Sequence, residues 1–290
     1  MVTRRELLIG GAAAIAAVSL TRLARADAAV TTPSPLPVSP PAPSPVDAIV
    51  GECQAIRALR DSIRALVADA AAGRRPRLVV IIGQTGVGKH QVARALHEAS
   101  QSHGAYVPVI PARIRQGRMA RALFGSASRQ SAWERARGGT VAIDLLEFVE
   151  ARVWPRLVRT LETGRCRRGG TQITEPLDAW TIGMTHHGLD AWIGEHTMGE
   201  LIASLDPVVL DVPPLDRRGD DIQLLADHFL VRHSRELNRP IRVLTPNARR
   251  MLASNRWPGN VRELENVMGL QMLRAAPAYI SCEDLAEVIG

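Results

Sequence analysis

The sequence predicts an α/β domain in which a parallel sheet lies between two layers of helices, followed by a small helical lid. Three observations support this fold class. The apolar run at residues 78–82 indicates a buried strand, and it ends at a glycine-rich segment that opens a helix. Short apolar strands then alternate with helical segments, which is typical of a parallel sheet covered on both faces. From Asp220 onward only helical spacing of apolar residues remains.

The individual elements follow in chain order. Residues 53–72 place apolar side chains at helical spacing ahead of the first strand. Further strands are expected at 106–110, 141–143, 178–184 and 208–210. Helices are expected at 222–230, 248–252 and 261–273, separated by Thr245-Pro246 and Trp257-Pro258-Gly259-Asn260. We therefore expect the α/β domain over residues 46–218 and the lid over residues 219–290.

Composition narrows the class of protein and its partners. The 290 residues are 46% hydrophobic, which is ample for a packed core, although aromatics at 3% leave aliphatic side chains to fill it. The formal net charge of +7 favours acidic partners. Arg165, Arg167 and Arg168 form the densest internal basic cluster, and without interleaved aromatics a solvated loop is favoured over a nucleic-acid patch. The three cysteines show no metal or disulfide spacing.

The N-terminus predicts a targeting segment over residues 1–29. Arg4-Arg5 precedes a mild apolar stretch and a small-residue site, Ala24-Arg25-Ala26, as in twin-arginine export signals. A non-functional amphipathic leader and a misassigned start are the alternatives. A proline-rich linker is expected over residues 30–45. The leader favours a periplasmic or membrane-tethered location, whereas the domain that follows favours the cytoplasm.

A phosphate-binding loop is predicted at Gly83-Gln84-Thr85-Gly86-Val87-Gly88-Lys89-His90, between a strand and a helix. Its glycines let backbone N–H groups converge on phosphate oxygens, and the helix N-terminus adds its dipole. The chain has 35 arginines but one lysine, Lys89, placed where a compact ammonium can reach the β- and γ-phosphates. We therefore expect ATP as the ligand.

A Mg²⁺ contact is predicted at Asp144, the acidic residue that ends the run Gly139-Thr140-Val141-Ala142-Ile143. The alternative is an ordinary aspartate capping the next turn. Two positions lack expected groups. His90 stands where a serine or threonine hydroxyl usually helps to hold the metal, and Leu145 stands where an acid usually polarises the attacking water. Glu147 lies nearby in sequence, but the sequence gives no contact for it.

Several segments together resemble the central domain of sigma-54-dependent transcriptional activators, an AAA+ ATPase. The resemblance spans residues 46–290. It is carried by Val50-Gly51-Glu52, the phosphate-binding loop, residues 92–97, Leu123-Phe124-Gly125, Gly138-Gly139-Thr140, residues 213–222 and Trp257-Pro258-Gly259-Asn260 with residues 261–266. It implies a P-loop AAA+ three-layer domain with a helical lid that assembles as a ring and remodels RNA polymerase holding sigma-54.

The resemblance also implies roles for single residues. Val50 and Gly51 would flank the adenine, Lys89 would hold phosphates and Asp144 would hold Mg²⁺. Arg262 matches the sensor arginine of the lid, for which a surface helix residue is the alternative, and Thr185 matches the polar sensor of a central strand. His186 stands where the family usually has Asn, and His90 where it usually has Glu.

The departures from the family predict altered activity. Only twelve residues, none of them glycine, separate Gly125 from Gly138, so the family's sigma-contact loop, Gly-Ala-Phe-Thr-Gly-Ala, is expected to be absent. The family supplies arginines across the subunit interface, but this sequence has Met198 and Ser204 at the matching positions. An arginine finger contributes about 10³–10⁵ in rate. With Leu145 in place of the acid, hydrolysis is expected to be slow or absent. The sequence also shows no helix-turn-helix segment after the lid.

Three functions are consistent with these observations. The first is an ATP-binding AAA+ module that hydrolyses ATP poorly and regulates through conformation or assembly. The second is an active ATP-dependent transcriptional regulator. The third is an exported interaction protein that keeps the fold without nucleotide turnover.

Overall fold

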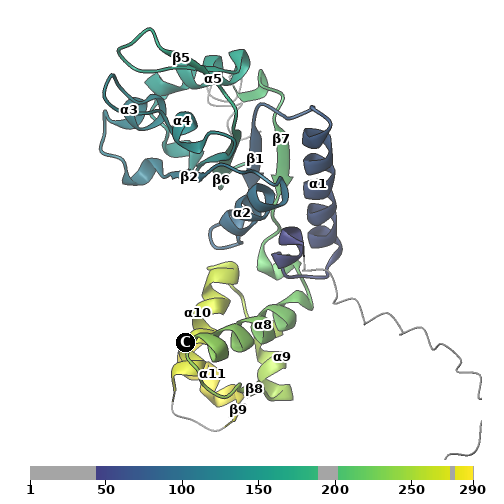
Figure 1. Ribbon diagram of the computed structural model, residues 1–290. Helices are drawn as coiled ribbons and strands as arrows, with labels where there is room; N and C mark the ends of the chain where they lie inside the picture. Colours follow the sequence, from purple (N-terminus) through teal and green to yellow (C-terminus); the bar gives the residue numbers. More distant parts are fainter. Residues whose placement is uncertain (1–43, 189–201, 275–277, 290) are drawn as a thin grey trace, which may run out of the picture. The chain divides into compact units, whose positions relative to one another are not determined.

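The computed structural model describes residues 44–188, 202–274 and 278–289 (Figure 1). The predicted leader and most of the predicted proline-rich linker lie outside these residues. A parallel sheet of five strands forms the centre, in the order β2-β3-β6-β1-β7. The strands are β1 (Val79–Ile82), β2 (Tyr106–Val109), β3 (Thr140–Ile143), β6 (Trp180–Thr185) and β7 (Val208–Asp211). The predicted α/β architecture with a parallel sheet is confirmed.

The register of the sheet determines which strand ends meet. Ile82, the last residue of β1, is paired with Thr185 at the end of β6 and with Asp211 at the end of β7. Ile143, the last residue of β3, is paired with Gly183 of β6. Parallel strands bring their carboxyl ends to one edge, where ligands of open α/β sheets bind. The residues that follow β1, β3 and β6 are therefore neighbours in space.

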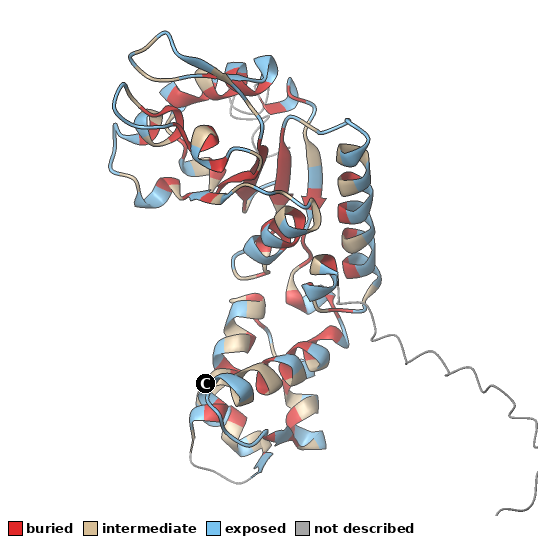
Figure 2. Cartoon of the chain, in the orientation of Figure 1, coloured by how far each residue is buried: buried red, intermediate tan, exposed pale blue. Residues whose placement is uncertain are grey.

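Helices cover both faces of the sheet, as Figure 1 shows. One face carries α1 (Gln54–Ala71) and α2 (Lys89–Ala99), and the other carries α3 (Met119–Phe124), α4 (Ala132–Ala136) and α5 (Trp154–Thr163). Successive strand residues alternate between the two core clusters, since Val79 packs with α1 and α2 while Val80 packs on the opposite side. The inner strands β1, β3 and β6 are consequently buried on both faces, whereas the edge strands β2 and β7 carry exposed residues (Figure 2).

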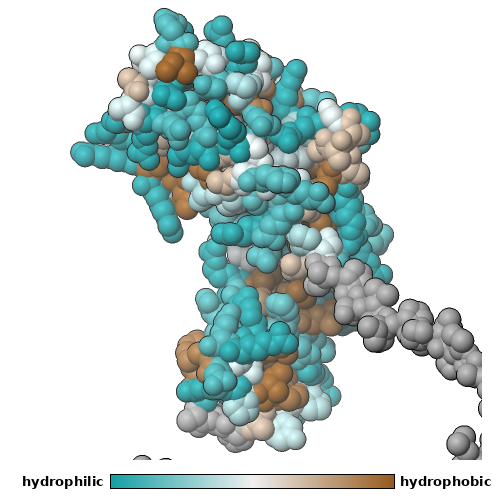
Figure 3. Space-filling model, viewed as in Figure 1, coloured by the Kyte–Doolittle hydropathy of each residue, from teal (hydrophilic) through white to brown (hydrophobic). Residues whose placement is uncertain are grey.

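The lid has its own core of buried residues, from Leu215 to Leu285. Its helices are α8 (Asp221–Glu236), α9 (Pro246–Ser254), α10 (Asn260–Leu273) and α11 (Cys282–Ile289). Two short parallel strands, β8 (Val243–Leu244) and β9 (Tyr279–Ile280), pair the segment between α8 and α9 with the segment between α10 and α11. Helical spacing alone did not predict them. In the face shown in Figure 3, apolar side chains gather over the lid more than over the α/β layer.

Short elements complete the described chain. Single 3₁₀ turns occur at η1 (Pro45–Ala48), η2 (Pro111–Arg113), η3 (Leu146–Phe148), η4 (Ala151–Val153) and η5 (Leu215–Arg217). The arginine cluster lies on a hairpin of β4 (Arg165–Arg167) and β5 (Thr174–Pro176), not on a plain loop. The reason is alternation, because Cys166 is buried between two exposed arginines. Among the described residues, no helix combines the length and apolar character needed to cross a bilayer.

Candidate functional site

The glycine-rich loop joins β1 to α2 at the carboxyl edge of the sheet. Gly88 caps α2 in the left-handed region, with φ of 105°. Gly86 also has a positive φ, 78°, and a Cβ atom there would overlap the carbonyl oxygen of Gly259 in the lid. Only glycine satisfies both conditions at position 86. The loop therefore turns tightly into the N-terminus of α2, where free N–H groups and the helix dipole favour an anion.

The lone lysine is held inside this loop. Lys89 is 7% exposed, and its Nζ donates hydrogen bonds to the carbonyl oxygens of Gly83 at 2.6 Å and Gln84 at 3.0 Å. Burial lowers the pKa of Lys89 to about 8, although the charge of Asp144 opposes the shift. The ammonium thus remains largely protonated at neutral pH, and an incoming anion would stabilise that form.

Asp144 follows β3 and lies against α2. Its Oδ2 is 3.1 Å from Nε2 of His90, in the first turn of α2. Burial alone would raise the pKa of the Asp144 carboxyl, but the hydrogen bond with His90 and the charges of His90 and Lys89 hold it below its ordinary value. The group is therefore an anion at neutral pH, as a metal ligand must be.

The residues around Asp144 fit Mg²⁺ only if a bound nucleotide supplies further oxygen ligands. Among the described ranges no cluster of three or more His, Cys, Asp or Glu side chains could hold a metal on its own. Mg²⁺ is commonly held by one or two carboxylates together with substrate phosphates. Asp144 would supply the carboxylate, and His90 has no hydroxyl to add.

The lid contacts the glycine-rich loop through Asn260. This residue is buried and has a positive φ of 53°, at the start of α10. Its Nδ2 donates to the carbonyl oxygen of Thr85 at 3.0 Å and to Oε1 of Gln84 at 3.2 Å. Its Oδ1 accepts from the backbone N–H of Leu215 at 2.8 Å. One amide side chain therefore connects the loop, the lid helix and the segment that enters the lid.

Two arginines extend this connection. The backbone N–H of Arg262 donates to the carbonyl oxygen of Gly86 at 3.1 Å, so its side chain starts at the loop. Arg218 is buried, and its guanidinium donates to the carbonyl oxygens of Val87 at 2.9 Å and Pro213 at 3.0 Å. The sequence segments 213–222 and 257–266 carry these contacts, although their sequence alone assigns no contact to Asn260 or Arg218.

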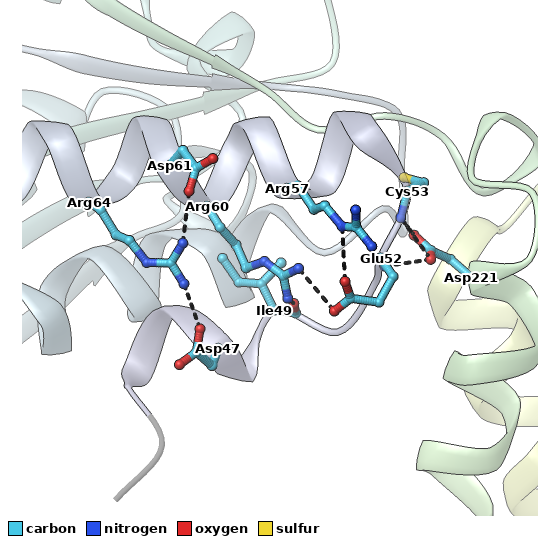
Figure 4. Close-up of polar contacts among 9 residues, drawn as sticks. All are labelled: Asp47, Ile49, Glu52, Cys53, Arg57, Arg60, Asp61, Arg64 and Asp221. Carbon is cyan, nitrogen blue, oxygen red and sulfur yellow. Dashed lines mark hydrogen bonds and ion pairs between the residues drawn. The ribbon is translucent and has the colours of Figure 1, made fainter. Parts of the chain in front are cut away.

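Asp221 fastens the segment around Gly51 to the start of α8 (Figure 4). Its Oδ1 accepts from the backbone N–H groups of Glu52 at 2.6 Å and Cys53 at 3.1 Å. Gly51 has a φ of 148°, and a Cβ there would lie 2.6 Å from Oδ2 of Asp221. Gly51 is thus required by this close approach, and Val50 beside it is fixed in place.

Replacing Asp221 with alanine is expected to destabilise the folded chain by about 1.5–3 kcal/mol, because hydrogen bonds to charged groups contribute that much. Asp221 is only 2% exposed, so water cannot readily replace the lost acceptor. Urea unfolding of the full chain measures the effect. The matched control is Asp216→Ala, at an exposed position five residues earlier. Equal unfolding free energies for the two variants would contradict the role of Asp221.

These elements surround a cavity of about 400 Å³, within the size range of small-molecule sites. Its lining includes the predicted residues Val50, Thr85, Gly86, Val87, Gly88, Lys89, His90, Asp144 and Arg262. Gly51, Gly83, Gln84 and Thr185 do not line it. The lining also includes Ile49, Leu225, His228, Phe229 and Arg232, which the sequence did not single out. The cavity therefore has a cationic, loop-lined end and an end with several apolar side chains.

A polar chain follows β6 on the far side of the loop. Thr185 is fully buried, and its hydroxyl accepts from the backbone N–H of His187 at 3.1 Å. His186 lines the cavity, with Nε2 3.3 Å from Oγ1 of Thr85. Its Nδ1 lies 3.1 Å from Oε1 of Glu147, in η3. No contact of Glu147 was predicted from the sequence, and in the structure its carboxylate lies beside the imidazole.

Comparison with known protein families identifies both parts of the chain. Residues 49–210 match the model of the sigma-54 interaction domain, and residues 216–290 match the model of the AAA+ ATPase lid domain. Among similar curated proteins, the transcriptional regulatory protein ZraR of Salmonella typhi is 32% identical over 73% of this chain and 51% of its own length. The nitrogen fixation protein VnfA of Azotobacter vinelandii is 35% identical over 70% and 41%.

Other similarities agree. The regulatory protein AtoC of Escherichia coli is 34% identical over 71% of this chain and 47% of its own. The chain spans about half the length of these curated relatives. A crystal structure of NtrX from Brucella abortus with ADP has a TM-score of 0.74 and 29% identity, covering 82% of this chain and 55% of NtrX. NtrX with ATP gives a TM-score of 0.71.

Proposed function

This chain belongs to the family of sigma-54-dependent activators, as an AAA+ module, and from this premise we propose that it binds ATP in the cavity and hydrolyses it slowly. The observation that carries the proposal is the convergence of Lys89, Asp144 and Arg262 on one cavity lined by a glycine-rich loop. Cations and free N–H groups at one end suit a triphosphate, and apolar side chains at the other suit a base. The structure of NtrX with ATP supports the same ligand.

Each predicted residue has a place in this proposal. The loop N–H groups and Lys89 bind the β- and γ-phosphates, and Asp144 would hold Mg²⁺, which would neutralise phosphate charge. Arg262 reaches the γ-phosphate from the lid, while Val50 borders the base. Gly51 does not line the cavity, so it acts by holding Val50 in place. Thr185 does not line the cavity, so it acts by fixing the backbone of the segment that carries His186.

We expect slow hydrolysis because two kinds of catalytic group that the family has, an acid and the interface arginines, are replaced in this chain. Leu145 lines the cavity where an acid would polarise the attacking water, and it offers no polar atom. Ser204, at one position of the family's interface arginines, donates to Oε1 of Glu162 at 3.2 Å. The other position, Met198, lies outside the described residues. The loss of an arginine finger alone reduces turnover by about 10³–10⁵.

We further propose that nucleotide binding regulates conformation or assembly. The contacts of Asn260 and Arg262 with the loop make the lid sensitive to an occupied site, which supports this role. The family suggests that the chain assembles into a ring and that its partners are RNA polymerase or a sigma factor. We propose that any contact with a sigma factor differs from that of the family. In support, the segment where the family has its sigma-contact loop, from Ser126 to Arg137, forms a tight turn and the short helix α4.

Thermal unfolding of the full chain with Mg-ATP tests the proposal. At ATP concentrations 100 times Kd, binding stabilises the folded state by about 2.7 kcal/mol. For a chain of this size, that corresponds to a rise in Tm of roughly 5–10 °C. The same chain should show this large Tm shift and yet release phosphate slowly from Mg-ATP. No shift with ATP would overturn the proposal, and steady turnover abolished by Asp144→Ala would favour an active regulator instead.

A further inference from the structure

We propose that His186 and Glu147 form a dyad that activates the attacking water, in place of the acid missing at position 145. His186 is the group that contacts the water, and Glu147 is the residue that positions it. The inference deepens the proposed function and rests on it, because it requires ATP in the cavity.

The position of His186 carries the first part of the argument. Its side chain is 31% exposed, lines the cavity, and follows the strand β6 that lies between β1 and β3 in the sheet. Nε2 lies 3.3 Å from the Thr85 hydroxyl, in the loop that would hold the phosphates. The imidazole is therefore on the phosphate side of the cavity. A water molecule bound there could reach both Nε2 and the terminal phosphate.

The surroundings of Glu147 carry the second part. Its two carboxylate oxygens are buried, and neither accepts a hydrogen bond of good geometry from any residue in the described ranges. Among the described residues, the basic side-chain nitrogen that lies close to it is Nδ1 of His186, 3.1 Å from Oε1. A buried carboxylate without donors is costly. In the neutral tautomer that carries its proton on Nδ1, on the side of Glu147, Nε2 is unprotonated and can accept from the Thr85 hydroxyl or from a water molecule.

Two other lining groups that could accept a proton are engaged with neighbouring side chains. His90 contacts the Asp144 carboxylate, the proposed metal ligand. Glu265 pairs with Arg232, both on lid helices. Leu145 has no polar side-chain atom. Within the described part of the lining, His186 is therefore the group best placed to accept a proton at the phosphate end.

The proposed step is ordinary general-base hydrolysis. The oxygen of water forms a bond to the γ-phosphorus while Nε2 of His186 takes one of the water protons. The bond from that phosphorus to the bridging oxygen breaks, and its electron pair leaves with ADP. The products are ADP and inorganic phosphate, and the imidazolium returns its proton to solvent. Glu147 stabilises the imidazolium during the step.

The charges around the imidazole are compatible with this role. Burial lowers the pKa of His186 below its ordinary value, and the positive charges of Lys89 and His187 lower it further. Glu147 and Asp144 oppose the shift. The ring is thus neutral at pH 7 and able to accept a proton. Removing the charge of Glu147 would lower this pKa again.

Single-turnover release of γ-phosphate from Mg-ATP by the full chain tests the dyad. Replacing His186 with alanine should reduce the rate about 10²-fold or more and leave the ATP-induced Tm shift in place. Added imidazole should restore part of the rate, which a purely structural role of His186 would not allow. The control is Glu98→Gln, at an exposed carboxylate on α2, which should retain the original rate.

Glu147→Gln distinguishes positioning from packing through the pH profile. The rate should rise with pH as His186 loses its proton and then level off. In Glu147→Gln the plateau should fall and the rise should move to lower pH, because the imidazole loses a neighbouring negative charge. A structural role would lower the plateau and leave the rise where it was.

The outcomes separate this inference from the function on which it rests. Undiminished phosphate release by His186→Ala would overturn the dyad and leave ATP binding intact. Phosphate release by the unsubstituted chain no faster than by Lys89→Ala would overturn it too. Absence of an ATP-induced shift in the unsubstituted chain would overturn both proposals.

Discussion

Replacing Lys89 with alanine should abolish the rise in Tm that Mg-ATP gives to the unsubstituted chain. The ammonium is the lone lysine, and its Nζ is anchored by two loop carbonyl groups at the point where the phosphates would bind. Loss of a charge-assisted contact of this kind leaves the phosphates without their main cation. Because the substitution also frees two carbonyl groups, the readout is the ATP-induced shift of each variant and not its absolute Tm.

Two further variants sharpen the Lys89 experiment. Lys89→Arg keeps the charge but cannot place a planar guanidinium in the same enclosed position, so it should also lose most of the shift. Arg159→Ala removes an exposed charge from α5, away from the cavity lining, and should keep the full shift. A full ATP-induced shift in Lys89→Ala would mean that the nucleotide binds elsewhere or that the loop does not hold its phosphates.

Sequence patterns predicted the parts of the fold that depend on local periodicity. The run at residues 78–82 and the loop after it had to be a strand and a turn into a helix, because apolar spacing and glycine placement allow little else. The β4–β5 hairpin was not predicted, because its alternation covers only Arg165, Cys166 and Arg167. Three residues are too few to separate a strand from a loop.

The residues of the candidate site could be predicted where a short sequence motif identifies them. They could not be predicted where their role depends on contacts between distant parts of the chain. Lys89 and Asp144 were identified from their neighbours in sequence, and both line the cavity. The pairing of Glu147 with His186 depends on η3 and β6 meeting in space, 39 positions apart along the chain. Asn260 likewise contacts Thr85 only because the lid folds back on the loop. No local pattern encodes such pairings.

The missing acid itself can be restored, and in the His186→Ala background Leu145→Glu should accelerate phosphate release by roughly 10²–10⁴, the range of general-base catalysis. Leu145 is half-buried, lines the cavity directly after Asp144 and sits at φ of 55° and ψ of 61°, with its backbone fixed by the start of η3. A glutamate there would present a carboxylate to the same space. The rate should still fall short of efficient turnover, because the interface arginines are replaced.

The comparison that isolates the carboxylate is Leu145→Glu against Leu145→Gln, which has nearly the same shape without the charge. Only the glutamate should raise the single-turnover rate, while both variants should keep an ATP-induced Tm shift. Placed in the His186→Ala background, Leu145→Glu should restore hydrolysis, because a carboxylate at position 145 makes the imidazole dispensable. Equal rates for the glutamate and glutamine variants, with ATP bound in both, would show that Leu145 does not limit the reaction. The cause of slow turnover would then lie with the groups that stabilise charge on the leaving nucleotide.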